Sequence, residues 1–456
     1  MTGDVHLLRY HEVTKHSPHS VAASSHRLDW SIKPLAFKIY RDLQAVEPPE
    51  DIRRLCLLSN GVLRWRRTAS DDVHGFRAAA CTGALYHVEL YLATAERDDL
   101  PAALYHYGAH DGLLRVLRAG DVRGALHRAA GEYEPMASAP LVFLLTSTFW
   151  RNAWKYQARA YRHAFWDGGA VLANLLAVLA ADAQPASVVM GFADDEVNHM
   201  LAVDGVREAC TSLLAVGAGA PSGAPVAALP PLTVATEPLS PREVRYPEIE
   251  QAHRASSLGT ASATAAWRAQ AGRASHEVPP AVVGSPIEEV IRRRRSARSF
   301  GRQPLTRDQL RALLAASIAP IPGDAFSPLP VEPLLIVNAV EGMAAGAYTG
   351  RLELIRQTDF RLKAAELALW QELAARAAAN VYFVADLQAV LERFGERGYR
   401  VAQLAGGICG GRLELAATDM GLAATGLTFF DDAVSEFFAP TARGRQVMYL
   451  AAVGAR

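Results

Sequence analysis

The sequence of 456 residues has few cysteines, and they stand far apart. The four are Cys56, Cys81, Cys210 and Cys409. Zinc sites and disulfide frameworks use cysteines at short, repeated spacings, and no such spacing occurs here. The sequence therefore argues against both kinds of site. It favours a reducing compartment, and we expect a cytoplasmic protein with no metal.

The sequence also lacks a net charge and a long apolar run. Its 47 basic and 47 acidic residues cancel, which excludes the basic footprint of a nucleic-acid binder. The most apolar run, residues 170–183, is interrupted by Asn174 and is shorter than the ~20 residues that a membrane span requires. The first residues carry histidines and charges where a signal peptide would be apolar. We predict no nucleic-acid partner and no membrane.

What the sequence does have is an internal duplication. Residues 150–169, WRNAWKYQARAYRHAFWDGG, return in weaker form as residues 392–407, ERFGERGYRVAQLAGG. Setting Lys155 against Arg393 gives an offset of 238 (393 − 155). At this offset the residues that meet an identical partner are Arg159, Tyr161, Arg162, Gly168 and Gly169, opposite Arg397, Tyr399, Arg400, Gly406 and Gly407. One copy has Lys-Tyr where the other has Arg-Phe.

The duplication extends over most of the chain and predicts its architecture. FADDEVNHML at 192–201 and FFDDAVSEFF at 429–438 close the two copies, and each copy mixes helical and strand patterns. This predicts an α+β fold in which two repeats, each a small sheet flanked by helices, pack as an intrachain pseudo-dimer. The predicted domains are an N-terminal arm at 1–50, a first repeat at 51–217, a Pro/Ala-rich linker at 218–285 and a second repeat at 286–456.

A basic segment, RRRRSARSF at 292–300, opens the second repeat. Guanidinium groups bind phosphate oxygens in planar, bidentate geometry, and a serine hydroxyl adds a donor. The alternative is a solvated basic face. The Ser-x-Arg-x-Phe ending favours a phosphate site.

The Lys-Tyr pair of the first copy is a candidate base. Arg159 and Arg162 follow Lys155 at i+4 and i+7, so a continuous helix would place three cations on one face. Crowded positive charge lowers the pKa of a lysine, and such a lysine can remove a proton with Tyr156 sharing it. A surface helix with solvated basic side chains is the alternative.

Two glycine-containing segments complete the candidates. ACTGALYH at 80–87 is a turn of small residues, and Gly83 would let the backbone approach a flat ring closely. An ordinary turn is the alternative. Four glycines recur in pairs four residues apart, which predicts close packing of one helix against another rather than chemistry; they are Gly406, Gly407, Gly410 and Gly411.

Together these segments resemble the flavin-dependent nitroreductase superfamily, and within it the SagB/ThcOx-type dehydrogenases in tandem, two-repeat form. The resemblance implies that FMN is the cofactor and that an Arg-Arg-Ser-x-Arg segment binds its phosphate. A second family segment lies along the flavin, and a late Gly-Leu turn borders it. The cofactor-binding residues implied are Arg294, Arg295, Ser296 and Arg298, with Cys81, Thr82, Gly83, Ala84 and Leu85, and with Gly426 and Leu427.

The same resemblance implies a reaction and partners. SagB/ThcOx-type enzymes oxidise thiazoline or oxazoline rings in modified peptides, and their Lys-Tyr pair is similar to Lys155 and Tyr156 here. The substrate would be an azoline-containing peptide, ribosomal or carrier-bound, and the partner a cyclodehydratase or synthetase. FMN would supply the redox chemistry, and the protein would supply orientation and a base.

The two repeats carry different parts of the family pattern. The arginine-serine segment occurs only in the second repeat. The flavin-side segment is recognisable only in the first, with Ala80 and Cys81 in place of the family's proline and serine. The two segments would complement each other, which predicts one FMN per chain. An NAD(P)H-dependent reductase and a flavin-free peptide-binding or complex-forming pseudoenzyme are the alternatives.

Overall fold

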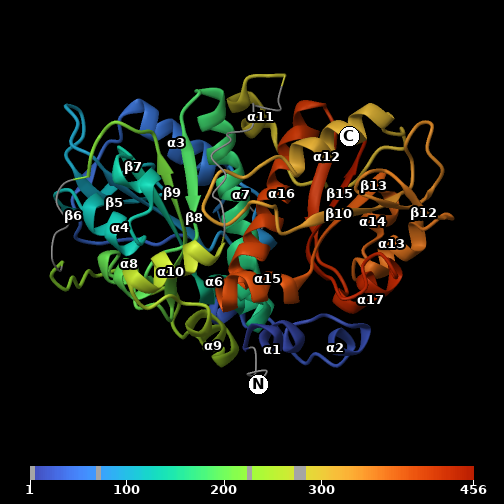
Figure 1. The fold of residues 1–456 in the computed structure, drawn as a ribbon, viewed down its shortest axis with the longest axis horizontal. Coiled ribbons are helices and arrows are strands. Elements are labelled where there is room, and N and C mark those ends of the chain that lie inside the picture. Colours follow the sequence, from blue (N-terminus) through green and yellow to red (C-terminus); the bar gives the residue numbers. More distant parts are fainter. Residues whose placement is uncertain (1–5, 68–72, 223–228, 272–283) are drawn as a thin grey trace.

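Two antiparallel sheets, one from each half of the chain, flank a central pair of long helices in this computed structural model (Figure 1). It describes residues 6–67, 73–222, 229–271 and 284–456. The first sheet has the order β1 (Ala45–Val46), β6 (Leu114–Ala119), β5 (Ala103–Tyr107), β4 (Val88–Thr94), β7 (Leu141–Thr148), β9 (Glu208–Val216) and β8 (Ala186–Val189).

The second sheet repeats the central part of the first. Its order is β12 (Leu354–Gln357), β11 (Gly346–Thr349), β10 (Glu332–Val337), β13 (Ala379–Ala385), β15 (Gln446–Gly454) and β14 (Ala423–Leu427). The apolar runs of β7 and β13 are buried along their whole length, as expected of strands covered on both faces. A separate hairpin pairs β2 (Val62–Arg67) with β3 (Val73–Arg77).

The central helices are α7 (Ala160–Ala181) and α16 (Gly398–Asp419), which cross in the middle of Figure 1. A Cβ atom on Gly169 would lie 2.6 Å from the carbonyl carbon of Gly407, and one on Gly407 would lie 2.5 Å from the oxygen of Trp166. Only glycine permits this approach of two backbones. The predicted role in helix packing is confirmed for Gly407 and Gly411, which face α7, but was wrong for Gly406 and Gly410, which face Met448 and Tyr449 of β15.

Each central helix is preceded by a sharp break. Helix α6 (Phe149–Tyr156) and the 3-10 turn η3 (Gln157–Arg159) precede α7, while α15 (Leu387–Phe394) and η4 (Gly395–Arg397) precede α16. Gln157 has φ 50° and ψ −141°, and Gly395 has φ 59° and ψ −162°. The prediction of one continuous helix from Arg151 was therefore wrong, because the chain turns sharply after Tyr156.

Reciprocal ion pairs join the two repeats across the centre. Asp431 opens α17 (Asp431–Phe437), and its carboxylate accepts from Arg159 at 2.9 Å and from Arg162 at 2.6 Å. The counterpart opens α8 (Asp194–Met200) and uses the equivalent residues, with Asp194 bound to Arg397 at 2.7 Å and to Arg400 at 2.6 Å. All six side chains are buried. The motifs that revealed the duplication therefore hold the repeats together.

The range predicted as a linker contains two packed helices, α9 (Pro247–Ala255) and α10 (Ala261–Ala271). Arg400 donates to the carbonyl of His253 in α9 at 2.7 Å, as Arg162 donates to that of His11 in α1 (His6–Val13) at 2.6 Å. Helix α9 is thus the counterpart of α1 and belongs to the repeated unit. Residues 223–228 and 272–283 of the predicted linker lie outside the described residues.

The remaining helices are shorter than the central pair. They are α2 (Pro18–Ala22), η1 (Trp30–Ile32), α3 (Glu50–Asn60), η2 (Thr82–Ala84), α4 (Arg123–Ala129), α5 (Glu134–Ala137), α11 (Ile287–Arg293), α12 (Arg307–Ser317), α13 (Arg361–Leu367) and α14 (Glu372–Arg376). Within the described ranges, one helical stretch, Phe149–Ala181, is long and apolar enough to cross a membrane. Its most apolar window is 83% buried at the centre of the molecule, as in a core helix.

Candidate functional site

The basic segment 294–298 runs along the edge strand of the second sheet. Ser296 pairs in parallel with Ala424 of β14, which fixes the segment against the sheet. The side chains of Arg295 and Arg298, on either side of Ser296, are exposed. Nη1 of Arg295 donates to the carbonyls of Arg292 at 2.6 Å and Arg294 at 2.7 Å. The rest of this guanidinium, the guanidinium of Arg298 and the hydroxyl of Ser296 are available to an anion at this edge.

Arg294 is instead buried and joins three parts of the chain. Its Nη1 donates to Oε2 of Glu414 at 2.9 Å, and its Nε donates to the carbonyl of Ala78 at 3.2 Å. Oε1 of Glu414 accepts from the backbone N–H of Gly426 at 3.2 Å, and burial raises the pKa of this carboxyl group. The segment predicted to bind phosphate thus meets the first repeat just before its predicted flavin-side turn, and it also meets the Gly-Leu turn.

The surroundings of Arg295 are cationic. Burial, followed by the charges of Arg64, Arg294 and Arg456, lowers the pKa of the Arg295 guanidinium. Arg64 belongs to the β2–β3 hairpin of the first repeat, so both repeats contribute positive charge. A phosphate bound here would relieve this repulsion.

The predicted flavin-side turn contains η2, with Cys81 before it and Leu85 after it. Gly83 has φ +65°, and a Cβ atom on it would lie 2.6 Å from Oη of Tyr156. Both the left-handed backbone and the close contact require glycine at this position. The structure therefore brings Tyr156 directly against the turn, while the next residue, Ala84, also has positive φ at 53°.

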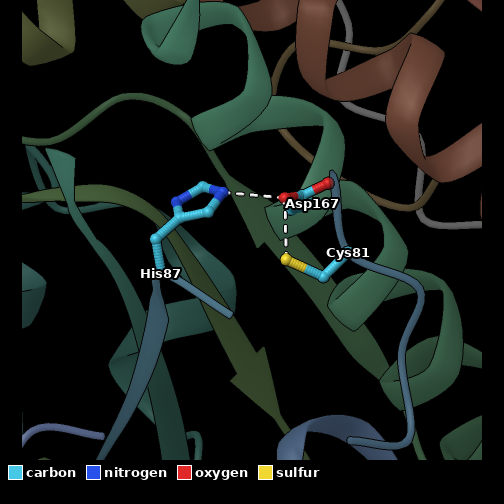
Figure 2. Close-up of side chains that lie close together, drawn as sticks. All are labelled: Cys81, His87 and Asp167. Atoms are coloured by element: carbon cyan, nitrogen blue, oxygen red, sulfur yellow. Dashed lines mark hydrogen bonds and ion pairs between the residues drawn. The ribbon is translucent and has the colours of Figure 1, made fainter. Parts of the chain in front are cut away.

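A buried carboxylate anchors this turn (Figure 2). Asp167 of α7 accepts from the backbone N–H of Thr82 at 3.0 Å and from its hydroxyl at 2.8 Å. It also contacts Sγ of Cys81 at 3.0 Å and Nε2 of His87 at 2.7 Å. Burial, with the Asp167 charge second, raises the pKa of the Cys81 thiol, so the sulfur acts as a donor rather than a nucleophile.

Cys81, His87 and Asp167 also form a group of potential metal ligands, with one ligand atom from each within 4.8 Å of the others. Sulfur, imidazole nitrogen and carboxylate oxygen suit a borderline ion such as zinc. The hydrogen bonds from Thr82 already satisfy one carboxylate oxygen, and the thiol and imidazole bind the other. The cluster is therefore explained as an anchor for the turn.

The sequence prediction missed Asp167 and His87 as site residues. The available signal was an acidic residue inside an apolar helix, directly before the paired glycines at 168 and 169. A buried charge is rare unless it is paired or accepts several hydrogen bonds. That rule would have marked Asp167 as a residue with a specific partner.

Tyr449 is a further residue that the prediction missed. A Cβ atom on Gly426 would collide with its hydroxyl oxygen, and one on Gly410 would collide with its ring, so both glycines make room for this side chain. Burial, then the charges of Glu414 and Asp167, raises the pKa of Tyr449. The phenol lies near the groups that bind Arg294 and anchor the turn. Leu427, next to Gly426, is half-buried.

The Lys-Tyr pair has a different setting from the one predicted. Lys155 is exposed, with Nζ 5.3 Å from the centre of the Tyr156 ring. The expected face of three cations does not form, because the break at Gln157 turns Arg159 and Arg162 into the core. Burial, followed by the charge of Asp167, raises the pKa of Tyr156. Tyr156 belongs to the site by contact with Gly83, and Lys155 lies at its outer edge.

Comparisons with known proteins agree with this architecture. Residues 291–455 match the model of the nitroreductase family. A putative nitroreductase from Anabaena variabilis ATCC 29413 is 27% identical and has a TM-score of 0.81, with 99% of each chain covered. No curated protein matches the chain.

Two other solved structures match less than half of this chain. One is the E. coli microcin synthetase McbBCD complex with truncated pro-MccB17 bound, at 18% identity, 45% of this chain, 73% of that chain and a TM-score of 0.32. The other is a putative nitroreductase in complex with FMN from Desulfovibrio desulfuricans, at 18% identity, 37% of this chain, 86% of that chain and a TM-score of 0.28. The full-length match confirms the predicted α+β fold of two nitroreductase-like halves, and the second half carries a nitroreductase family domain.

Proposed function

We propose that this protein is an FMN-dependent oxidoreductase with one cofactor site formed jointly by its two repeats. The observation that carries the proposal is the bonding of Arg294, which joins the phosphate segment of the second repeat to Ala78 of the first and, through Glu414, to Gly426. The three segments that resemble flavin-binding motifs are distant in sequence and converge here.

The residues at this place fit the cofactor. Ser296, Arg295 and Arg298 would hold the phosphate, since two exposed guanidinium groups and a hydroxyl suit its oxygens. The backbones at Gly83 and Gly426 would approach a planar ring closely. Bound FMN would supply the redox step by accepting two electrons as a hydride. Arg294 would act by positioning the segment, because its own charge is already paired with Glu414.

For the substrate, we propose an azoline ring in a modified peptide, ribosomal or carrier-bound, delivered by a cyclodehydratase or synthetase partner in the cytoplasm. Such a ring loses an acidified proton next to its carbonyl while a hydride leaves the neighbouring carbon. Lys155, once deprotonated, would take that proton at the outer edge of the site. The raised pKa of Tyr156 keeps its phenol protonated, so it can donate a hydrogen bond beside Gly83.

The exposure of Lys155 also favours a second candidate function. Lys155 is exposed, and Arg159 and Arg162 are paired with Asp431 in the core. These two arginines therefore do not supply the cationic surroundings expected of a lysine base. A reductase that passes electrons from NAD(P)H to a nitro, quinone or other small acceptor needs no such base. The cofactor site that the two repeats form around Arg294 would serve either reaction.

The test begins with the visible absorbance of the full-length protein, which should be yellow after incubation with FMN. Lys155→Ala and Tyr156→Phe should retain FMN and lose azoline oxidation, while Arg376→Gln, an exposed change on α14, should keep both. Rapid anaerobic bleaching of the flavin by NADPH would favour the reductase. A colourless protein that takes up no FMN would contradict both functions and support the flavin-free alternative.

A further inference from the structure

The second repeat has a counterpart of the flavin-side turn that its sequence conceals. The strands that follow the two turns have the same register in their sheets, and the equivalent pairs are Leu90 with Leu145 and Pro333 with Phe383. Because Phe383 is the copy of Leu145 at the offset of 238, residues 323–330 take the place of residues 80–87. The sequence shows no recognisable copy of this segment because the two turns share almost no residue types.

This second turn contacts the first repeat, whereas the first turn meets the second repeat through Ala78, just before it. Asp324, at the place of Cys81, accepts from the backbone N–H groups of Met190 at 2.8 Å and of Gly191 at 2.9 Å. Met190 and Gly191 are the counterparts of Leu427 and Thr428 at an offset of 237. The parts that border the first site are therefore present, in mirrored roles, at a second one.

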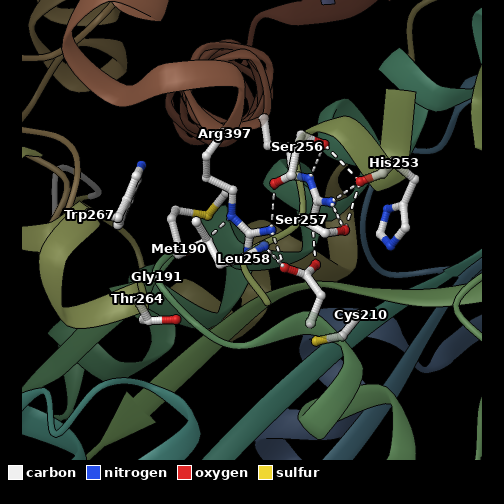
Figure 3. A network of polar contacts seen from close by, with 12 residues as sticks. Met190, Gly191, Cys210, His253, Ser256, Ser257, Leu258, Thr264, Trp267 and Arg397 are labelled. Carbon is white, nitrogen blue, oxygen red and sulfur yellow. Dashed lines mark hydrogen bonds and ion pairs between the residues drawn. The ribbon is translucent and has the colours of Figure 1, made fainter. Parts of the chain in front are cut away.

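Helix α10 lies at this second position, and Figure 3 shows its Trp267 beside Met190 and Gly191. A Cβ atom on Gly191 would lie 2.8 Å from the ring of Trp267 and 2.7 Å from Nη2 of Arg268. Nη2 of Arg268 donates to the carbonyl of Gly191 at 2.8 Å, and its Nε donates to Asp324 at 3.2 Å. A planar indole and a guanidinium of the chain itself thus lie against the counterparts of the flavin-bordering segments.

Arg393 and Phe394, the counterparts of Lys155 and Tyr156, hold helix α10 in place. Nε1 of Trp267 donates to the carbonyl of Phe394 at 2.7 Å. Arg393 donates through Nε to the last residue of α10, Ala271, at 3.0 Å, and through Nη2 to Ser327 of the second turn at 2.6 Å. Arg393 and Phe394 stand where the first repeat has its Lys-Tyr pair, so the second copy of the pair binds the helix instead of bordering an open site.

We infer that α10 closes a second, pseudo-symmetric flavin position, with Trp267 and Arg268 filling it and Arg393 with Phe394 fixing the helix. Each chain then holds one flavin at most, for a steric reason as well as for lack of a phosphate segment. The stoichiometry rests on the proposed function of the first site. The closure itself does not.

The experiment removes the side chain of Trp267 and then adds free indole to the protein. In Trp267→Gly, the vacated space should lower the thermal midpoint by roughly 5 to 10 °C, and millimolar indole should restore part of that loss. The control is Trp370→Gly, because the Trp370 ring is 57% exposed and its φ of 55° suits glycine. It should lose little and should not respond to indole. Flavin per chain, measured at saturating FMN, should be one in the wild type.

Each outcome decides the inference. A Trp267→Gly variant as stable as the wild type, or a wild type that binds two flavins, would overturn it. Should Trp267→Gly fail to fold, Arg268→Met keeps the ring and should lower the midpoint by a few degrees, and no change there would also overturn the inference. A protein without flavin would refute the proposed function while the indole response still reports the closed position.

Discussion

The two copies of the opening stretch share a frame and differ in what surrounds it. In both, an arginine pair binds an aspartate of the other repeat, and the second glycine of the pair, Gly169 or Gly407, lets the central helices cross. In the first copy the Lys-Tyr pair lies beside a turn of small residues at the edge of the candidate site. In the second copy the Arg-Phe pair holds a helix. The copies share the ion pairs that stabilise the pseudo-dimer and differ in the residues beside the two turns.

The buried aspartates at the two turns also differ between the repeats. The first site has its buried acid on the central helix, at Asp167, and a thiol on the turn, at Cys81. The second position has the acid on the turn, at Asp324, and Ala405 on the helix at the place of Asp167. One acid anchors its own turn, and the other binds the opposite repeat and Arg268. The two positions have equivalent places in the fold but carry their acidic residues on different elements. They would therefore not bind the same ligand in the same way.

The shared ion pairs should give the largest effects. Asp431→Asn and Asp194→Asn each leave two buried guanidinium groups without a carboxylate, and we expect each change to lower the free energy of unfolding by about 3–5 kcal/mol. Denaturant titrations would measure both. The exposed neighbour Asp195→Asn should change stability by less than about 0.5 kcal/mol. Very unequal losses for the two aspartates would break the symmetry that we describe.

Acid should weaken the same pairs. The charges of Arg397 and Arg400 outweigh burial and lower the pKa of Asp194 to about 2, and the pKa of Asp431 is also lowered by its two arginines. A carboxylate with a depressed folded-state pKa stabilises the protein above its unfolded value, near pH 4, and loses this contribution as pH falls towards 2. The loss should be about 2 kcal/mol for Asp194, seen as a falling thermal midpoint. Stability that stays flat over this range would contradict the assignment.

The helix crossing should discriminate between adjacent glycines. Gly169→Ala would press a methyl group into the backbone of α16, and we expect a loss of about 1–3 kcal/mol. Gly168→Ala places its Cβ 3.8 Å from Leu404, an ordinary contact, and should gain up to about 1 kcal/mol from helix propensity. Comparing the two variants by denaturation sharpens the symmetry argument, and equal effects would contradict it.

The pair that differs between the repeats should give the smallest effects, and unequal ones in its two copies. Arg393→Ala removes the bonds to Ala271 and Ser327 and should cost about 1–2 kcal/mol of stability. Lys155→Ala removes an exposed side chain and should cost less than about 0.5 kcal/mol. Thermal unfolding of both variants would test this. A larger loss for Lys155 than for Arg393 would reverse the comparison.

The sequence by itself determined the duplication, the α+β class and the role of Gly407 in helix packing, because identical residues recur at one spacing. Thr306 and Gln309, a threonine and a glutamine three residues apart, form the capping box of α12, which residue type and spacing alone indicate. These features depend on local pattern or on direct repetition. The segments that make the candidate site were recognised in the same way, by their residue types.

Only the tertiary structure decided which residues meet. The chain turns sharply after Tyr156 because Gln157 has a positive φ, and a glutamine does not predict this conformation. The bond of Thr82 to Asp167 joins residues 85 positions apart, and the bond of Arg268 to Asp324 joins residues 56 positions apart. The second turn shares its fold position with the first but almost none of its residues. The register of a strand is set by its pairing with neighbouring strands. It can therefore stay the same after the side chains of the preceding turn have changed.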